Sequence, residues 1–434
     1  MKKFLTWSGF RKFLNDVHLW VGLSSGLLVL LICLSGTIYV FNTEIREFSR
    51  PEMYHVSPST NAKRLAAEKL IAMVSQETGG KVVSIKIPSD PERSYVLTVR
   101  KPEESRPGEN KEAKSKGRAG ETSKENSGKR SGEKAEKGGS EKPGPPARGI
   151  QYMVDPYTGQ ILGNSNEKTA ITEFMQLMFS LHRWLLLDRI EEPLFGELPN
   201  RTLGSYISGT ATILFTLGVI TGMVIWFPRK IRSWKNGLKI KWDGNWKRVN
   251  HDLHNSLGFY SCILLFLMGI TGPQWSFSWY REGLRKTLGT YQPEGAPKPE
   301  TPHSIIQGTG SAKTLFIGDF ISAANKTLNY HGDLTIALAA DSAEAIVVNK
   351  VKTGFFAPVA SDKIYLDQYT ASVLQSDIFS AKPLNERISA SIKALHVGDV
   401  YGSFSKILYF LACLIATSLP VTGTLIWLNK MKKG

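Results

Sequence analysis

Four long apolar runs dominate this sequence of 434 residues, and they restrict the folds that the chain can adopt. The runs lie near residues 17–41, 204–227, 254–279 and 404–428, and none has a charged residue at its centre. Each exceeds the roughly 20 residues that a helix needs to cross a hydrocarbon core of about 30 Å. We therefore predict four transmembrane helices in a lipid bilayer. The first is expected to be a retained anchor, because it is too long for a signal peptide.

Basic residues are concentrated in the short segments that flank these runs. They lie at the N-terminus, in the connection 229–253 and in the C-terminal tail. Such residues mark the cytoplasmic side, since the positive-inside bias acts on short flanks while long loops translocate largely regardless of charge. We expect both termini in the cytoplasm and the long connections outside. The net charge of +16 follows from this topology and from a Lys-rich insert, so no nucleic-acid partner is expected.

The segments outside the membrane form an internal sequence repeat with two copies. After the first run, a polar helix is expected near residues 60–77, followed by the strand patterns KVVSIKI and SYVLTVR. After the third run, TLFIGDFISAANKTL, DLTIALAA and AIVVNKV repeat this order, and the hairpin DPYTGQIL at Asp155 aligns with DQYTASVL at Asp367. The predicted fold class is a membrane α-helical protein with two parallel repeats. Each repeat carries a small extracytoplasmic α+β domain.

One segment, residues 102–148, belongs to neither copy. It has no aromatic residue and no aliphatic residue other than alanine, so it cannot form a core and is expected to be disordered. The predicted organisation along the chain is as follows: cytoplasmic N-terminus and first helix 1–41, first extracytoplasmic domain with the insert 42–203, second helix 204–228, basic cytoplasmic loop 229–253, third helix 254–279, second extracytoplasmic domain 280–403, and fourth helix with cytoplasmic tail 404–434.

Each of the four runs has its own histidine. His18 and His254 open the first and third runs, and His182 and His396 come before the second and fourth. The runs also share a Ser-Gly or Thr-Gly dipeptide near one end: Ser35-Gly36, Thr221-Gly222, Thr271-Gly272 and Thr422-Gly423. The repeat places His18 opposite His254 near the cytoplasmic face, and His182 opposite His396 near the outer face. Two facing neutral imidazoles suit an electron-transferring haem, and no C-x-x-C-H is present, so we predict two b-type haems.

Other residues near these histidines are open to two interpretations. Gly22 and Gly258 lie four residues after His18 and His254 on the same helix face, where a missing side chain would admit a porphyrin. Close helix packing is the alternative for both glycines. Arg183 could neutralise a haem propionate, although a solvated interfacial arginine is the commoner case.

A fifth histidine, His251, lies on the same helix face as His254 and could replace it as a ligand. The first copy has Asn15 at the matching place, so we interpret His251 as an interfacial or supporting residue. The three remaining histidines fall outside the runs and are expected at the surface: His55, His303 and His331.

The His-x-x-x-Gly openings, the T-G-x-x-x-W endings and the DPYTGQIL hairpin resemble the PepSY-associated transmembrane family. This family includes iron-regulated ferric-siderophore reductases of the bacterial inner membrane. The resemblance covers nearly the whole chain apart from the insert. DVHLWVG, SLHRWLLL, HDLHNSLG and ALHVGDVYG stand where the family has its histidine motifs, which implies that the four histidines are axial haem ligands. The sequence departs from the family at Asn255, where Arg is common, and at Leu186, where Gly is frequent; both leave the propionate partners open.

The resemblance implies a di-haem ferric-chelate reductase that passes electrons outward to a periplasmic ferric siderophore and releases Fe(II). No GxGxxG follows a strand, and no cytoplasmic stretch could hold a flavin or nicotinamide domain, so the donor is expected to be a separate protein or a quinol. Two alternatives remain. A transport accessory protein predicts charged or broken helices at mid-membrane, and a PepSY-domain sensor without redox activity leaves the four histidines unexplained.

Overall fold

The computed structural model describes residues 7–58, 62–101, 149–228, 234–293, 295–297, 300–305 and 315–432. The predicted insert at 102–148 lies outside the described residues, as does part of the basic connection between the second and third runs.

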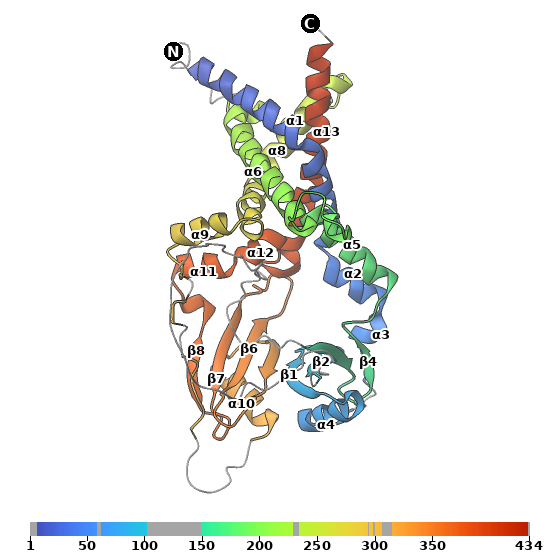
Figure 1. The fold of residues 1–434 in the computed structure, drawn as a ribbon, viewed down its shortest axis with the longest axis vertical. Coiled ribbons are helices and arrows are strands. Elements are labelled where there is room, and N and C mark those ends of the chain that lie inside the picture. Colours follow the sequence, from blue (N-terminus) through green and yellow to red (C-terminus); the bar gives the residue numbers. More distant parts are fainter. Residues whose placement is uncertain are drawn as a thin grey trace, which may run out of the picture.

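Four long helices form the membrane part, in agreement with the four apolar runs. They are α1 (Trp7–Tyr39), α6 (Asn200–Trp226), α8 (Trp246–Thr271) and α13 (Gly402–Met431), and all are long and apolar enough to cross a membrane. α1 packs against α6 and α13, and α8 packs against the same two helices, so α1 and α8 lie diagonally across the bundle. α1 begins and α13 ends on the side away from the sheet (Figure 1).

Hydroxyl side chains within these helices bond to the helix backbone. The Ser25 hydroxyl donates to the carbonyl of Val21 at 2.7 Å, and the Thr37 hydroxyl donates to the carbonyl of Cys33 at 2.7 Å. A polar group in lipid must find its partner within the protein, and the carbonyl one turn earlier supplies it. Polar residues are therefore tolerated in the apolar runs.

An eight-stranded antiparallel sheet lies beyond one end of the bundle, with the strand order β4-β3-β2-β1-β5-β6-β7-β8. The pair β1–β5 joins the halves, with Ser84 opposite Ala337 and Ile87 opposite Leu334. We predicted a small α+β domain in each half, and the structure adds that the strands of the two halves form one sheet. Period-two patterning shows which residues are strands but does not show which strand edges pair. The strands are β1 (Lys81–Ile87), β2 (Tyr95–Arg100), β3 (Ile150–Val154), β4 (Ile161–Asn164), β5 (Gly332–Ala337), β6 (Ile346–Lys352), β7 (Ser361–Leu366) and β8 (Val373–Asp377).

Two helices, α4 (Ala67–Thr78) and α10 (Ile317–Thr327), pack against this sheet and against each other. Their apolar faces and alternate strand residues form one continuous core that crosses the junction of the halves. Its fully buried members include Leu70, Val74, Ile85, Leu97, Ile336, Val348 and Ile364. The sheet is thus one structural unit.

The two aligned hairpins have the same turn. Asp155 Oδ1 accepts from Tyr157 N at 2.8 Å, and Asp367 Oδ1 accepts from Tyr369 N at 2.9 Å. Five residues into each motif the backbone is left-handed, at Gly159 in one copy and at Ala371 in the other.

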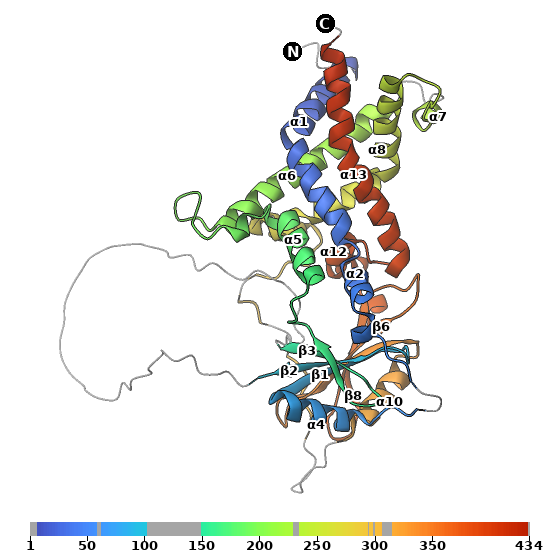
Figure 2. The same ribbon diagram turned by 90° about the vertical axis from the view of Figure 1, so that its right-hand side faces the viewer.

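Short helices connect the sheet to the membrane part. α5 (Ala170–Trp184) and α12 (Ile392–Val397) lie at the sheet-side end of the membrane helices (Figure 2). The remaining short helices are α2 (Asn42–Ser49), α3 (Pro51–Tyr54), η1 (Leu187–Arg189), α7 (Trp234–Gly237), η3 (Pro273–Trp275), α9 (Ser278–Thr287), η4 (Phe379–Ala381) and α11 (Leu384–Ala390).

Candidate functional site

The structure brings the four predicted histidines together in two pairs. The imidazole rings of His18 on α1 and His254 on α8 have centroids 6.3 Å apart. This far-side pair, away from the sheet, joins the two helices that lie diagonally across the bundle. The rings of His182 on α5 and His396 on α12 have centroids 6.2 Å apart and form the sheet-side pair.

The sheet-side pair is held on short helices that end directly after the histidines. α5 ends at Trp184 and α12 at Val397, and the residues that follow them, Leu185 and Gly398, are both left-handed. A β-carbon at Gly398 would lie 2.4 Å from the β-carbon of Tyr409, so only glycine fits there. Burial lowers the pKa of His182, and burial together with the neighbouring His182 lowers the pKa of His396 to about 3. Both rings are therefore neutral, which is the form that binds metal.

A second helix fixes the orientation of every ring through Nδ1. The Nδ1–H of His18 donates to the carbonyl of Gly218 at 3.0 Å, that of His182 to the carbonyl of Ile32 at 2.8 Å, and that of His396 to the carbonyl of Met268 at 3.2 Å. A carbonyl oxygen only accepts, so Nδ1 carries a proton in each of these three rings. The Nε2 atoms are left as bases, as metal-ligating imidazoles require.

In His254, the partner of Nδ1 is a hydroxyl group instead of a carbonyl. Its Nδ1 lies 2.9 Å from Thr422 Oγ1, and that hydroxyl donates its own proton to the carbonyl of Ser418 at 3.0 Å. The threonine oxygen is therefore free to accept from the ring. Threonine hydroxyls also lie 3.1 Å from Nδ1 of His18 and of His396, at Thr221 and Thr271.

The four Ser-Gly and Thr-Gly dipeptides lie against these rings, and we call the glycine that contacts each ring the seat of that ring. A β-carbon at Gly222 would lie 3.1 Å from Cε1 of His18, and one at Gly423 would lie 3.2 Å from Cε1 of His254. The corresponding distances are 3.0 Å from Gly36 to His182 and 3.4 Å from Gly272 to His396. In the sequence these dipeptides are recognisable as a repeated motif, but no role could be assigned to them. The one signal for the contact is that the dipeptide occurs once for each histidine.

Both pairs fit a haem better than a bare ion. Two metal–nitrogen bonds of about 2 Å each, with the half-rings beyond them, span roughly 6 Å, as the ring centroids do. Within the described residues, every hydrogen bond of the four rings is made by Nδ1. The same part of the chain contains no cluster of three or more His, Cys, Asp or Glu side chains that could hold a free metal ion. Two imidazoles suffice only for a metal that brings its other ligands, as porphyrin iron does.

Gly22 has no close neighbour on another helix, whereas Gly258 has one. A β-carbon at Gly22 would meet no atom within 4 Å, and one at Gly258 would meet only Leu419 Cδ2 at 3.8 Å. Close helix packing therefore does not explain Gly22. Gly22 is exposed on the same face of α1 as His18, one turn away, so a flat ligand bound at His18 could lie against the backbone there.

Arg183 is a cation with no carboxylate partner among the residues that the structure describes. Its Nη2 donates to the carbonyl of Trp275 at 2.9 Å, and the ring of Trp275 lies 4.9 Å from that of His396. Burial and the nearby Arg201 lower the pKa of Arg183 to about 10, so it stays charged at neutral pH. A half-buried cation beside the sheet-side pair, without a carboxylate partner in the described part of the chain, suits an anionic group of a cofactor.

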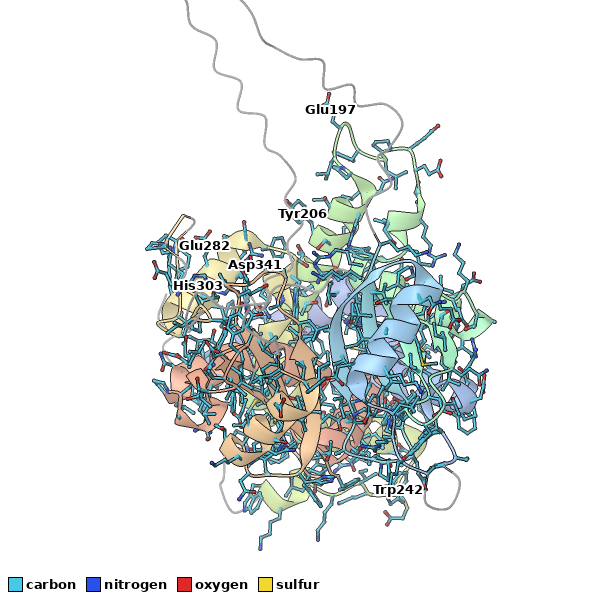
Figure 3. All side chains as sticks on the ribbon, turned by 90° about the horizontal axis from the view of Figure 1, so that it is seen from below. Glu197, Tyr206, Trp242, Glu282, His303 and Asp341 are labelled. Carbon is cyan, nitrogen blue, oxygen red and sulfur yellow. The ribbon has the colours of Figure 1, made fainter. Side chains whose placement is uncertain are left out.

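The other histidines do not take part in the pairs. His251 is about half exposed, lies 3.6 Å from Asp252 and contacts Asn255, so it is not a member of the far-side pair. His55, His303 and His331 are exposed, as expected, and Figure 3 shows His303 at the edge of the molecule seen from the sheet side.

A pocket of about 480 Å³ lies near the far-side pair. It is lined by Ser8, Arg11, Lys12, Asn15 and Pro228. Asn15 and Arg11 lie three and seven residues before His18, so all three share one face of α1. Arg11 also donates to the carbonyl of Ile225 on α6. A pocket with two basic residues thus lies toward the start of α1 from His18. Arg248, another basic residue near this end of the bundle, is paired with Asp252 at 2.9 Å.

The comparison with protein families agrees with the resemblance seen in the sequence. The model of the PepSY-associated TM region matches residues 16–430. The chain belongs to this family. The PepSY-associated match spans the four membrane helices, the sheet and both histidine pairs. No protein among the curated ones compared with it matches the chain.

Proposed function

We propose that this PepSY-associated membrane protein binds two b-type haems and carries electrons across the bilayer. The observation that supports this most strongly is the arrangement of the histidines. They form two facing pairs at opposite ends of the bundle, and the Nδ1 atom of each ring has a hydrogen-bond partner on a second helix. Haem iron with both axial positions filled supplies one-electron redox chemistry and disfavours oxygen binding.

The separation of the pairs suits transfer across a membrane. Gly36, the seat of His182, lies on α1 with His18, 18 positions further along. That is about 27 Å of helix, close to the thickness of a hydrocarbon core. His254 and Gly272, the seat of His396, have the same spacing at α8. The far-side pair would receive electrons and the sheet-side pair would release them.

We propose that the sheet side faces the periplasm of a bacterial inner membrane. The basic flanks of the apolar runs lie at the other end, where the positive-inside bias places the cytoplasm. An electron moving outward then gains about 2.3 kcal/mol for each 100 mV of membrane potential. The donor would be a cytoplasmic protein or a quinol. The pocket with Arg11 and Lys12 would attract an anionic group on that donor.

The proposed acceptor is a ferric siderophore or another ferric chelate, and the protein would act as its reductase. One electron converts Fe(III) to Fe(II), which weakens its binding to the chelate and releases the iron. This substrate class rests on the family resemblance and on the position of the sheet beside the sheet-side pair. Arg183 would balance the charge of a haem propionate there and so help to retain the cofactor.

Sealed vesicles test the direction and the acceptor together. Chemically reduced protein, oriented with the sheet outward, should be reoxidised by a membrane-impermeant ferric chelate, and a ferrous-specific chelator outside should trap the Fe(II). His182→Ala and His396→Ala should abolish this reoxidation while the far-side haem still becomes reduced, and His251→Ala is the matched control. If a small artificial oxidant succeeds where ferric chelates fail, iron is not the acceptor. A colourless protein would instead favour the sensor without redox activity.

A further inference from the structure

The loop between β6 and β7 carries two phenylalanines whose side chains are exposed. Phe355 is 50% exposed and Phe356 is 64% exposed, with ring centroids 4.8 Å apart. Both rings lie near Phe404 at the start of α13, at 6.2 Å and 5.0 Å. The loop has no charged residue from Thr353 to Ala360. It therefore forms an aromatic cluster with the membrane helix.

Backbone contacts hold this loop against α13. Phe404 N donates to the carbonyl of Phe355 at 3.2 Å, and Val359 N donates to the carbonyl of Val400 at 3.4 Å. Gly402 is left-handed, and a β-carbon there would lie 3.0 Å from the carbonyl oxygen of Gly354. The loop and the helix end are thus close at three points, and the two rings are fixed in place relative to α13.

The cluster continues an apolar face of the membrane helix. Beyond Phe404, the exposed apolar residues of α13 recur at helical spacing: Ile407, Leu408, Leu411 and Leu414. Residues at this spacing lie on one side of a helix, and in a transmembrane segment an exposed apolar side faces lipid. Phe355 and Phe356 extend that lipid-facing side at its sheet-side end, where β6 lies beneath α13 (Figure 2).

We propose that the loop carrying Phe355 and Phe356 inserts into the sheet-side leaflet of the bilayer, at the boundary between headgroups and acyl chains. Its ligand is phospholipid, and aromatic side chains are favoured at this depth. Because the loop leads directly into β6 and β7, insertion fixes one end of the sheet at the membrane. α12, which carries His396, ends three residues before Val400, so the same anchor sets the position of the sheet beside the sheet-side pair. This inference does not depend on haem binding.

Site-specific fluorescence in lipid vesicles tests the proposal. Phe356→Cys is labelled with an environment-sensitive fluorophore in full-length protein, reconstituted into phosphatidylcholine and phosphatidylglycerol vesicles. The matched control is Ser342→Cys, an exposed position in the turn between β5 and β6 at the other end of β6. Unsubstituted protein gives the background from the native cysteines. We expect blue-shifted emission at position 356 and several-fold stronger quenching by lipids with a nitroxide near the headgroup than at position 342.

Two outcomes would overturn the proposal. Equal, solvent-like emission at positions 356 and 342 would place the loop in water. Blue-shifted emission at 356 without quenching by nitroxide lipids would mean that protein covers the loop, for example a second copy of the chain. Should Phe356→Cys fail to fold by circular dichroism, the label at Ala357 makes the same measurement and leaves both rings in place.

Discussion

The two halves of the chain hold their histidines in the same way but connect them differently. In each half, both rings contact a membrane helix of that half: His18 contacts α6 and His182 contacts α1, while His254 contacts α13 and His396 contacts α8. Each pair, however, takes one ring from each half. A half therefore orients its own imidazoles, and only the union of the halves creates a site with two axial ligands.

The differences between the halves lie in the connectors. The helix that carries His182 has 15 residues, whereas the helix that carries His396 has 6. Arg183 follows His182, but Val397 follows His396, so at this position the first half has a half-buried cation and the second half has an apolar residue. The features that the halves share are those that touch the rings, while the features that differ distinguish the two ends of the bundle.

The largest expected effect comes from removing one ring. His18→Ala or His254→Ala should abolish the far-side haem and leave the sheet-side haem spectrally intact, because each site needs one ligand from each half. His182→Ala and His396→Ala should do the reverse. Absorption and low-temperature EPR spectra of the purified variants check this, with His251→Ala as the control. Loss of a haem in His251→Ala, but not in His254→Ala, would show that the far-side ligand is wrongly assigned.

Gly22→Leu should be the next most damaging change. A side chain there meets no protein atom within 4 Å of its β-carbon, so the protein should fold, but the side chain would fill the space beside His18. We expect much lower occupancy of the far-side haem and an unchanged sheet-side haem. Haem content is measured beside the circular dichroism spectrum of the same sample. Full haem occupancy in a folded Gly22→Leu protein would mean that no ligand uses this space.

Thr422→Val and Thr221→Val distinguish the two rings of the far-side pair. His18 keeps the carbonyl of Gly218 at 3.0 Å when Thr221 is changed, whereas His254 would lose its 2.9 Å partner Thr422 Oγ1 and keep only the weaker contact with the Leu419 backbone. A lost bond to Nδ1 makes the imidazole a weaker donor to iron and raises the reduction potential. A bond of about 1 kcal/mol corresponds to a shift on the order of 40 mV. The titration uses a His396→Ala background, in which only the far-side haem is expected. The shift in reduction potential should be larger for Thr422→Val than for Thr221→Val, and equal shifts would contradict this asymmetry.

The smallest effect concerns the matched hairpins. Ala371 has φ 54° where the other half has Gly159 at φ 82°. A non-glycine residue in this region costs roughly 1–2 kcal/mol, and the greater freedom of glycine in the unfolded chain offsets part of that. Ala371→Gly should therefore raise the unfolding temperature by roughly 1–2 °C. Gly159→Ala should lower it, because φ 82° is strained for any residue with a β-carbon and the Met73 side chain would also have to move. Differential scanning fluorimetry in detergent compares the two; a drop for Ala371→Gly would contradict the strain argument.

Much of this arrangement could be predicted from the sequence, because it depends on local patterns. Apolar run length gave the four membrane helices, and period-two alternation gave the strands of both halves. The pairing of His18 with His254 followed from the repeat. The β1–β5 junction could not be predicted, since strand edges carry no sequence mark of their partner. The seats of the rings depend on contacts between helices far apart in the sequence, such as His182 with Gly36, and only the packed bundle reveals them.

The haem content of the purified protein tests the central claim most directly. Pyridine haemochrome analysis, set against protein concentration from amino-acid analysis, gives the number and type of haems in each chain. Two histidine pairs, each built from both halves, predict two b-type haems per chain in fully loaded preparations. A value of one, or none, would contradict the account.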